Sequence, residues 1–460
     1  MDTSTAPPSP ARAAAGAPPA PTLQQPAAAA LLQQPLQEAL PTLPLRGDRL
    51  WRRLETLSGF TRPDLPWTRR AFSPEFIAAR AWLQGEFASA GLAVRLDAAG
   101  NLIGRREGRM PGAPALMSGS HSDTVTQGGR FDGILGVVAA LEVAHALHDA
   151  GQTWHHPLEV VDFLAEEPTD HGVSCVGSRA MAGLLDLPLL QATDPLGETL
   201  AQALRRIGGM PELIDTARRE PGSLAAFVEL HIEQGPVLEQ EHLAIGVVTH
   251  IVGIHRVEIT VTGQPDHAGT TPMALRRDAL AGAAALITLA HHRARALNHA
   301  HRYVVATVGR MAVEPNSTNT VPGLVRMSLE VRSDDPEVLR SFADELLRSA
   351  EGEMQRCRVA ATARTQTLTQ PTRADEGVIA AIEQAARRHG HAHRCMPSGA
   401  GHDAAPLART APMGMVFIPC RGGRSHCARE WSDPEQVLAG TQVLAATLQG
   451  LDRQWAVIHQ

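Results

Sequence analysis

Aromatic side chains are scarce in this chain, at 3% of 460 residues, and Tyr303 is its single tyrosine. The cores must therefore be built mainly from Ala, Leu, Val and Ile. No apolar run approaches the roughly 20 residues that a membrane helix requires. No basic start followed by an apolar stretch indicates a secretory signal. The sequence thus predicts a cytoplasmic protein without a membrane partner.

Cysteine is also rare, with five residues that lie far apart and form no Cys-x-x-Cys pair. An odd and scattered set argues against a disulfide framework and against a cysteine-based structural zinc site. The formal net charge of -6 gives no general attraction to nucleic acid. What is present is an ordinary globular composition, with 43% hydrophobic and 20% charged residues, together with 21 histidines.

The chain is long enough for two or three domains. Residues 1–45 are rich in Ala, Pro and Gln, which predicts a disordered tail. After this tail, buried strands alternate with helices, as in a doubly wound α/β domain with a mixed sheet. The segment 251–361 instead shows a β-α-β-β-α-β order, typical of a ferredoxin-like α+β unit. We therefore predict that this segment is inserted into a catalytic domain formed by 46–250 and 362–460.

Three predicted strands end in residues that could bind a metal. His121 follows the apolar run 115–120, the pair Glu166–Glu167 follows the run 158–164, and His231 lies near the end of a third strand. The carboxyl ends of such strands line the crevice where open α/β sheets place their sites. Asp123, two residues after His121, could accept a hydrogen bond from its second ring nitrogen.

Two further candidates lie next to glycines. Asp132 directly precedes a predicted helix, and His426 lies in a Gly-rich turn. Taken alone, Asp132 is more typical of a helix N-cap, and His426 is more typical of a polar surface. Together with the strand ends they form a set of imidazoles and carboxylates that suits zinc, manganese, cobalt or nickel. A shared carboxylate would allow two ions about 3.5–4 Å apart, although a single ion remains open.

The two adjacent glutamates invite different roles. Two carboxylates at a strand end would repel each other if both were buried without partners. Binding of a metal by one of them resolves this and leaves its neighbour to act as a general base. The alternative is a pair of solvated loop glutamates.

The motifs that contain these residues also carry a family resemblance. They are Gly119-Ser120-His121-Ser122-Asp123, Gly129-Arg130-Phe131-Asp132-Gly133, Glu166-Glu167, Gly177-Ser178-Arg179-Ala180-Met181-Ala182-Gly183, Glu229-Leu230-His231-Ile232-Glu233-Gln234-Gly235 and Ser398-Gly399-Ala400-Gly401-His402-Asp403-Ala404. In their order and spacing, from about residue 48 to residue 455, the sequence resembles the allantoate amidohydrolase / N-carbamoyl-L-amino-acid hydrolase family. This family belongs to the dinuclear aminoacylase–carboxypeptidase group.

The resemblance implies a centre with two divalent cations. His121 and His231 would hold one ion, Glu167 and His426 the other, and Asp132 would bridge them. It further implies that Glu166 is the general base. It also implies a homodimer formed through the inserted domain, which would close over the site as a lid.

The resemblance implies five substrate contacts as well: Gln234, His267, Asn319, Arg332 and Gly401. His267 would polarise the scissile carbonyl, which would make it catalytic. Asn319 and Arg332 would grip a substrate carboxylate from one cleft. The alternatives without a role in substrate binding are a hinge contact for His267, a turn for Asn319 and a surface ion pair for Arg332. Gly401 could merely shape the pocket floor.

Two features depart from the family pattern. Pro168-Thr169-Asp170-His171 follows the glutamate pair where many relatives carry Gly and then Arg-Phe, so this loop could alter specificity. Cys427, beside His426, replaces a small polar residue and could be oxidised or bind a soft metal.

The predicted function is hydrolysis of the carbamoyl C–N bond of N-carbamoyl-L-amino acids by metal-activated hydroxide. The products would be ammonia, carbon dioxide and the amino acid. The first alternative is an allantoate amidohydrolase or β-ureidopropionase, because those substrates also combine a ureido group with a carboxylate. Remoter alternatives are an aminoacylase or peptidase and a non-catalytic binding protein. A small ureido acid is thus the predicted partner.

Overall fold

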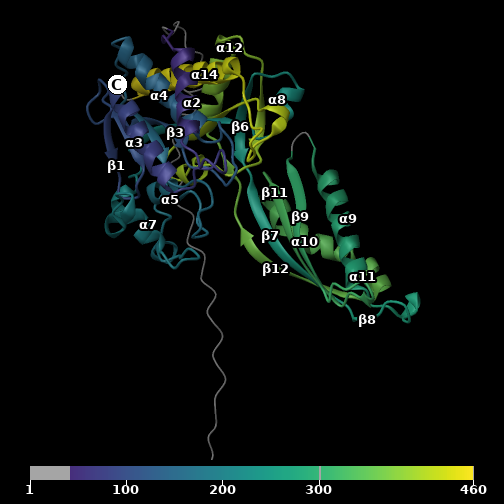
Figure 1. The fold of residues 1–460 in the computed structure, drawn as a ribbon. Coiled ribbons are helices and arrows are strands. Elements are labelled where there is room, and N and C mark those ends of the chain that lie inside the picture. Colours follow the sequence, from purple (N-terminus) through teal and green to yellow (C-terminus); the bar gives the residue numbers. More distant parts are fainter. Residues whose placement is uncertain (1–41, 300–301, 459–460) are drawn as a thin grey trace, which may run out of the picture.

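The computed structural model describes residues 42–299 and 302–458. The predicted tail, 1–45, lies outside this range apart from its last four residues. One of these, Leu43, is already buried and packs into the main core. Two sheets of different size organise the described chain (Figure 1).

The larger sheet has nine strands and confirms the prediction of a mixed α/β fold. Eight strands follow the order β1-β2-β4-β3-β5-β15-β6-β13, and β14 also pairs with β6. The pairs β3–β4, β3–β5, β15–β5 and β14–β6 are parallel, and the remaining pairs are antiparallel. The strands are β1 (Ala93–Leu96), β2 (Leu102–Arg106), β3 (Ala115–His121), β4 (Leu158–Phe163), β5 (Leu224–Ile232), β6 (Ile245–Ile251), β13 (Thr372–Arg373), β14 (His393–Ser398) and β15 (Met413–Ile418).

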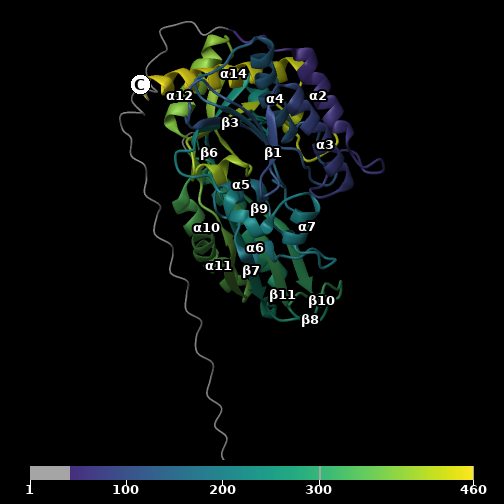
Figure 2. The ribbon, with the colours of Figure 1, turned by 90° about the vertical axis from the view of Figure 1, so that its left-hand side faces the viewer.

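Helices cover both faces of this sheet, which explains why β3, β4, β5 and β15 are buried along their whole length. One face is covered by α2 (Gly47–Gly59), α3 (Pro74–Ser89), α4 (Ile134–Asp149), α12 (Glu376–Arg388) and α14 (Pro434–Ile458) (Figures 1 and 2). The other face packs against α5 (Val176–Met181) and α13 (Ala404–Leu407). The short helices α6 (Leu187–Leu190), α7 (Leu200–Arg206) and α8 (Val237–Gln240) lie in the connections.

The smaller sheet is antiparallel and has the order β12-β7-β11-β9. Its strands are β7 (Gly253–Thr262), β9 (Val304–Glu314), β11 (Leu324–Ser333) and β12 (Ala360–Leu368). With α9 (Ala279–Leu297), α10 (Pro336–Ser349) and α11 (Glu351–Cys357) it follows the β-α-β-β-α-β order and encloses a core of its own. Figure 1 shows this unit projecting from the larger sheet.

The first helix of this unit is shorter than its apolar pattern indicates. The sequence predicts a helix over 273–297, but α9 begins at Ala279 because the Asp278 carboxylate caps it, accepting hydrogen bonds from the N–H groups of Leu280 and Ala281. Residues Met273–Leu275 form a separate 3-10 turn.

A two-stranded ribbon ends the projecting unit. Strand β8 (Asp266–His267) pairs with β10 (Thr320–Val321). Figure 1 places β8 at the end farthest from the larger sheet. The unit therefore has a near end, at the larger sheet, and a tip, at β8 and β10.

The part of the chain that is described contains no helix that is both long and apolar enough for a membrane span. All five cysteines lie within it, and each is free.

Candidate metal centre

The ends of three neighbouring strands bring the predicted ligands together. Strands β3 and β4, and β3 and β5, run parallel and side by side, so their carboxyl ends meet at one edge of the sheet. His121 is the last residue of β3, His231 is the penultimate residue of β5, and Glu167 follows β4 after a short turn. The strand-end rule therefore predicted this convergence correctly.

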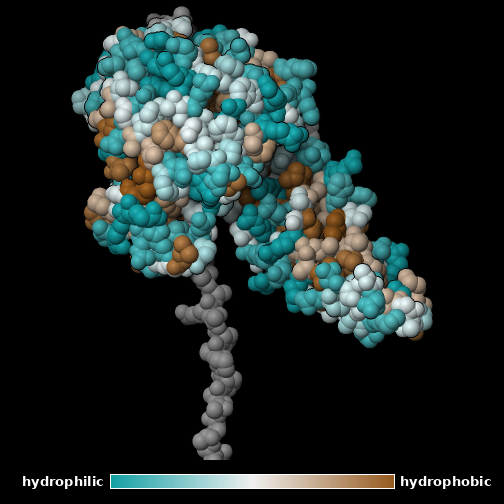
Figure 3. Space-filling model, in the orientation of Figure 1, coloured by the Kyte–Doolittle hydropathy of each residue, from teal (hydrophilic) through white to brown (hydrophobic). Residues whose placement is uncertain are grey.

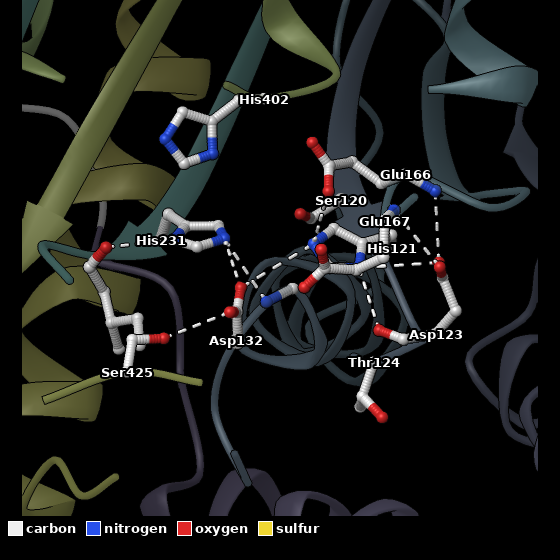
Figure 4. Close-up of polar contacts among 12 residues, drawn as sticks. Ser120, His121, Asp123, Thr124, Asp132, Glu166, Glu167, His231, His402 and Ser425 are labelled. Carbon is white, nitrogen blue, oxygen red and sulfur yellow. Dashed lines mark hydrogen bonds and ion pairs between the residues drawn. The ribbon is translucent and has the colours of Figure 1, made fainter. Parts of the chain in front are cut away.

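Two groups of three side chains share Asp132. Figure 4 shows the first of them, His121, Asp132 and His231. In the first, His231 Nε2 lies 3.2 Å and His121 Nε2 3.8 Å from Asp132 Oδ1. In the second, His426 Nε2 lies 2.9 Å from Asp132 Oδ2 and 3.2 Å from Glu167 Oε1. Within each group the possible ligand atoms all lie within 4.8 Å of one another. Because each group uses a different oxygen of Asp132, this carboxylate can face two positions at once.

The alternative role of Asp132 as a helix cap is wrong. Gly133 is the N-cap of α4, with φ 69°, and no side chain caps this helix. A Cβ atom at Gly133 would lie 2.4 Å from the His121 ring. The glycine therefore permits both the backbone turn and the close approach of the imidazole, and it leaves Asp132 free to face the histidines.

Backbone carbonyls orient both buried histidines. His121 Nδ1 lies 3.0 Å from the Asp123 carbonyl oxygen, and His231 Nδ1 lies 2.9 Å from the Ile232 carbonyl oxygen. This arrangement turns both Nε2 atoms toward Asp132, as a second shell of hydrogen bonds does for metal ligands. The predicted acceptor was the Asp123 carboxylate, but its oxygen is farther away, at 3.5 Å. It instead accepts the N–H groups of Glu166 and Glu167, each at 3.2 Å.

The charges of the centre fit bound cations. Among the residues that the structure describes, the ion-pair partners of Asp132, Glu166 and Glu167 are all histidines, and no Arg or Lys neutralises them. Burial alone would lower the pKa of His121, but the neighbouring carboxylates, Asp123 and Glu166 first, raise it well above its usual value. Such a cluster of negative charge is the environment that attracts divalent ions.

Glu166 lies beside the two groups without belonging to either. Its side chain is only 11% exposed, and Oε2 lies 3.7 Å from His121 Nε2. The Cys175 thiol donates a hydrogen bond to Oε1 at 3.5 Å. Burial raises the pKa of Glu166 well above its usual value. The alternative of solvated loop glutamates is therefore wrong, because Glu167 is also buried.

Two supporting residues escaped prediction as site residues. Glu430, 1% exposed, accepts the N–H groups of Phe131 and Asp132 at 2.7 and 3.1 Å. The Ser425 hydroxyl contacts Asp132 Oδ2 at 3.1 Å and Glu430 Oε2 at 2.7 Å. Burial raises the pKa of Glu430 to about 7. Glu430 follows His426 by four residues in an irregular segment, where no strand or helix pattern marks a buried carboxylate.

A cavity of about 630 Å³ opens beside the centre, between the two parts of the chain. Figure 3 shows the surface hollowed where they meet. Gln234, Arg332 and His426 line it. Gln234 Nε2 donates to Asp132 Oδ2 at 3.0 Å, and Arg332 Nη1 donates to the Gly399 carbonyl at 2.8 Å. The guanidinium is half-buried rather than on the open surface, although it also pairs with Glu330 at 2.8 Å.

Gly401 does not line this cavity. Gly399 and Ala400 do, whereas Gly401 is exposed and a Cβ atom there would meet nothing within 4 Å. The turn after β14 thus presents its first residues to the cavity and its third to solvent.

His267 and Asn319 lie together at the tip, away from the centre (Figure 1). The Ala268 N–H donates to the Asn319 carbonyl at 2.8 Å, and exposed His267 accepts the N–H of Gly269 at Nδ1. The prediction that Asn319 and Arg332 face one cleft is wrong within a single chain. Arg332 is the penultimate residue of β11, whereas Asn319 lies before its first residue, and the ten residues of this strand span about 30 Å at roughly 3.3 Å each. His267 is likewise no hinge contact.

The two departures from the family pattern lie in different places. Cys427 lines the cavity beside His426. Within the described chain, no residue of the loop 168–171 lines the cavity, so the expected effect of this loop on specificity has no direct contact to support it.

Metal binding is expected to strengthen as the pH rises and to release protons. Hydrogen bonds with Asp132 and Glu167 raise the pKa of His426 to about 11. In metal-free protein this ring is therefore protonated at neutral pH, and it must lose that proton before Nε2 can bind an ion. Calorimetric titration in two buffers with different ionisation enthalpies measures the released protons. An affinity that does not change with pH would contradict this expectation, and a His426→Ala variant is the control.

Residues 117–450 match peptidase family M20/M25/M40. The chain is 40% identical over 409 residues to an N-carbamoyl-L-amino-acid amidohydrolase of Paenarthrobacter aurescens, covering 89% of this chain and 98% of that one. It is 33% identical to a probable allantoate deiminase of Oryza sativa subsp. japonica, covering 88% of this chain and 89% of the relative.

A solved structure agrees with the same assignment. An amidase of the hydantoinase/carbamoylase family from Burkholderia multivorans superposes with a TM-score of 0.82 at 37% identity, covering 89% of this chain and 99% of that one. The matches span both the strand ends that hold the histidines and the projecting unit. The chain therefore belongs to the M20/M25/M40 peptidase family of metal-dependent hydrolases and, within it, to the hydantoinase/carbamoylase amidohydrolases.

Proposed function

We propose that this protein hydrolyses the carbamoyl C–N bond of N-carbamoyl-L-amino acids. The observation that carries the proposal is the position of Arg332, whose guanidinium lines the same cavity as His426 of the metal centre. A planar guanidinium binds a carboxylate through two parallel hydrogen bonds. A substrate held this way by its carboxylate would present its ureido group to the centre.

The centre would hold two divalent ions. His121 and His231 would bind one, Glu167 and His426 the other, and Asp132 both, because these are the two groups that share it. When bound, such ions polarise a carbonyl group and lower the pKa of water. Zinc, manganese, cobalt and nickel all suit this ligand set.

Glu166 is the proposed proton carrier. Its buried carboxylate lies next to both groups but is not needed by either. It would accept a proton from the attacking water and deliver it to the leaving nitrogen. Burial raises the pKa of this carboxyl, which makes it a stronger base and favours the first half of that transfer. Water attack on the carbamoyl carbon then yields the amino acid, ammonia and carbon dioxide.

His267 and Asn319 can contribute only if the tip approaches a metal centre. Because about 30 Å of strand separates the tip from Arg332, a second copy of the chain could supply both residues in a homodimer formed through the projecting unit. Closure of this unit as a lid would bring the contributions together. Sedimentation of the purified protein at several concentrations tests this, since a stable monomer with full activity would exclude it.

An Arg332→Ala variant is expected to lose roughly 10- to 100-fold in kcat/KM, since hydrogen bonds to a charged group contribute about 1.5–3 kcal/mol. Most of the loss should be in KM, because the carboxylate stays bound through the whole reaction. Steady-state kinetics on an N-carbamoyl-L-amino acid and on its amide, which lacks the charge, provide the comparison. Unchanged kinetics on the acid would show that Arg332 is not the clamp.

The function itself is tested by ammonia release from N-carbamoyl-L-amino acids, N-carbamoyl-β-alanine and allantoate, with EDTA as the control. Turnover of the N-carbamoyl-L-amino acids that EDTA abolishes is the expected result. Preference for allantoate would instead assign the protein as an allantoate amidohydrolase. Its similarity to the probable allantoate deiminase of Oryza sativa subsp. japonica supports this second candidate. Release from none of them would direct attention to acyl-amino acids and peptides.

A further inference from the structure

The loop after the glutamate pair contains a buried histidine that the proposed reaction does not use. His171 is 9% exposed, and neither of its ring nitrogens has a hydrogen-bond partner. The ring packs edge-on against Phe72, with centroids 5.8 Å apart. A buried imidazole without a partner is uncommon and costly, so some function or ligand should account for it.

The unpartnered ring faces two carboxylates from another segment. Ligand atoms of His171, Asp194 and Glu198 all lie within 4.8 Å of one another. The carboxylates belong to the connection between α6 and α7, where Asp194 Oδ1 accepts the N–H groups of Leu196 and Glu198 at 2.9 and 2.8 Å. These hydrogen bonds hold the Asp194 carboxylate in place whether or not His171 approaches.

The Arg206 guanidinium already pairs with Glu198 of this cluster, and the carboxylate oxygens can still bind a second cation. Arg206 donates to both oxygens of Glu198, at 3.1 and 2.9 Å. Each carboxylate oxygen keeps a second lone pair, so this pairing does not exhaust Glu198. The two carboxylates outnumber the one guanidinium, so these three charged groups carry a net negative charge.

We propose that His171, Asp194 and Glu198 bind a further divalent transition-metal ion, separate from the Asp132 centre. One imidazole and two carboxylates match the ligand preferences of zinc and its neighbours. Calcium and magnesium prefer sites made of oxygen alone. The two sites share no residue.

The site would connect to the loop that carries Glu166. The Cys175 N–H donates to the Glu166 carbonyl at 2.9 Å, which closes the base of the loop 166–175. His171 lies midway along this loop, away from its closed base. An ion bound by His171 would attach the middle of this loop to the turn at Asp194. It would thereby restrain the segment on which the buried carboxylate depends for its position.

Zinc counting by mass spectrometry tests the proposal, using full-length protein stripped of metal and dialysed against zinc. A His171→Gln variant is expected to hold one zinc ion fewer per chain than the unaltered protein. His292→Gln, at an exposed position on α9, is the matched control and should lose none. His171→Phe keeps the packing against Phe72 and should lose the same ion, which separates metal binding from misfolding.

An Asp132→Ala background makes the result independent of the catalytic centre. There, chains with His171 should retain one zinc ion and chains with His171→Gln none. Equal zinc content with and without His171 in both backgrounds would overturn the proposal. Calcium occupying the site as tightly as zinc would overturn the assignment to a transition metal.

Discussion

A Glu166→Gln variant is expected to lose about 10²–10⁴ in kcat, the usual contribution of a general acid–base group. The amide is nearly the same size but cannot take up the proton. Its metal content should stay at the level of the unaltered protein, because Glu166 belongs to neither ligand group. Ammonia release and metal analysis on the same preparation measure both quantities.

The comparison variant is Glu337→Gln, an exposed glutamate at the start of α10. It makes the same chemical change far from the centre and should leave kcat unaltered. Loss of metal together with activity in Glu166→Gln would mean that this residue is a ligand. Retained activity would mean that the base lies elsewhere.

An Asp132→Ala variant is expected to lose both ions of the centre and, with them, all measurable activity. Outer-shell substitutions weaken metal binding by about 10–100-fold, and removal of a ligand shared by both groups should exceed that range. Loss of the Asp132 carboxylate also leaves His121, His231 and His426 without the partner that they share. Equilibrium dialysis with zinc measures the affinity.

Glu167→Ala gives the matched contrast, since Glu167 belongs to one group only. It should weaken one ion and spare the other. The test of bridging uses a His171→Gln background, so that the further site proposed above holds no ion. If Asp132→Ala in that background still leaves one ion tightly bound, the carboxylate does not bridge, and Asp132 holds one ion at most.

The part of this centre that sequence could predict is the part that strands position. His121, Glu167 and His231 follow apolar runs, and the strand-end rule needs only those runs to place them together. Asp132 was ambiguous because a carboxylate before a helix is suited both to capping and to binding an ion. The backbone of Gly133 resolves the ambiguity, and backbone angles are not visible in a sequence.

What sequence could not predict depends on contacts between distant segments. Glu430 supports the Asp132 backbone from almost 300 residues away, and nothing in its neighbourhood indicates burial. Strand β14, with the sequence His-Arg-Cys-Met-Pro-Ser, has no apolar run to mark it. The positions of His267 and Asn319 relative to the metal centre depend on how whole units are arranged, so no local pattern could place them.

The length of β11 has a consequence for how such proteins can change over time. The strand is a covalent spacer between Arg332 and the tip, so a deletion of one residue would shorten the reach by about 3.3 Å and reverse the faces of every side chain beyond it. Its partners β7 and β9 would have to shorten in step to preserve the pairing. The projecting sheet can therefore change length at β11 only if its partners shorten with it or take up the difference as a bulge, as β9 already does opposite Ser328 and Leu329.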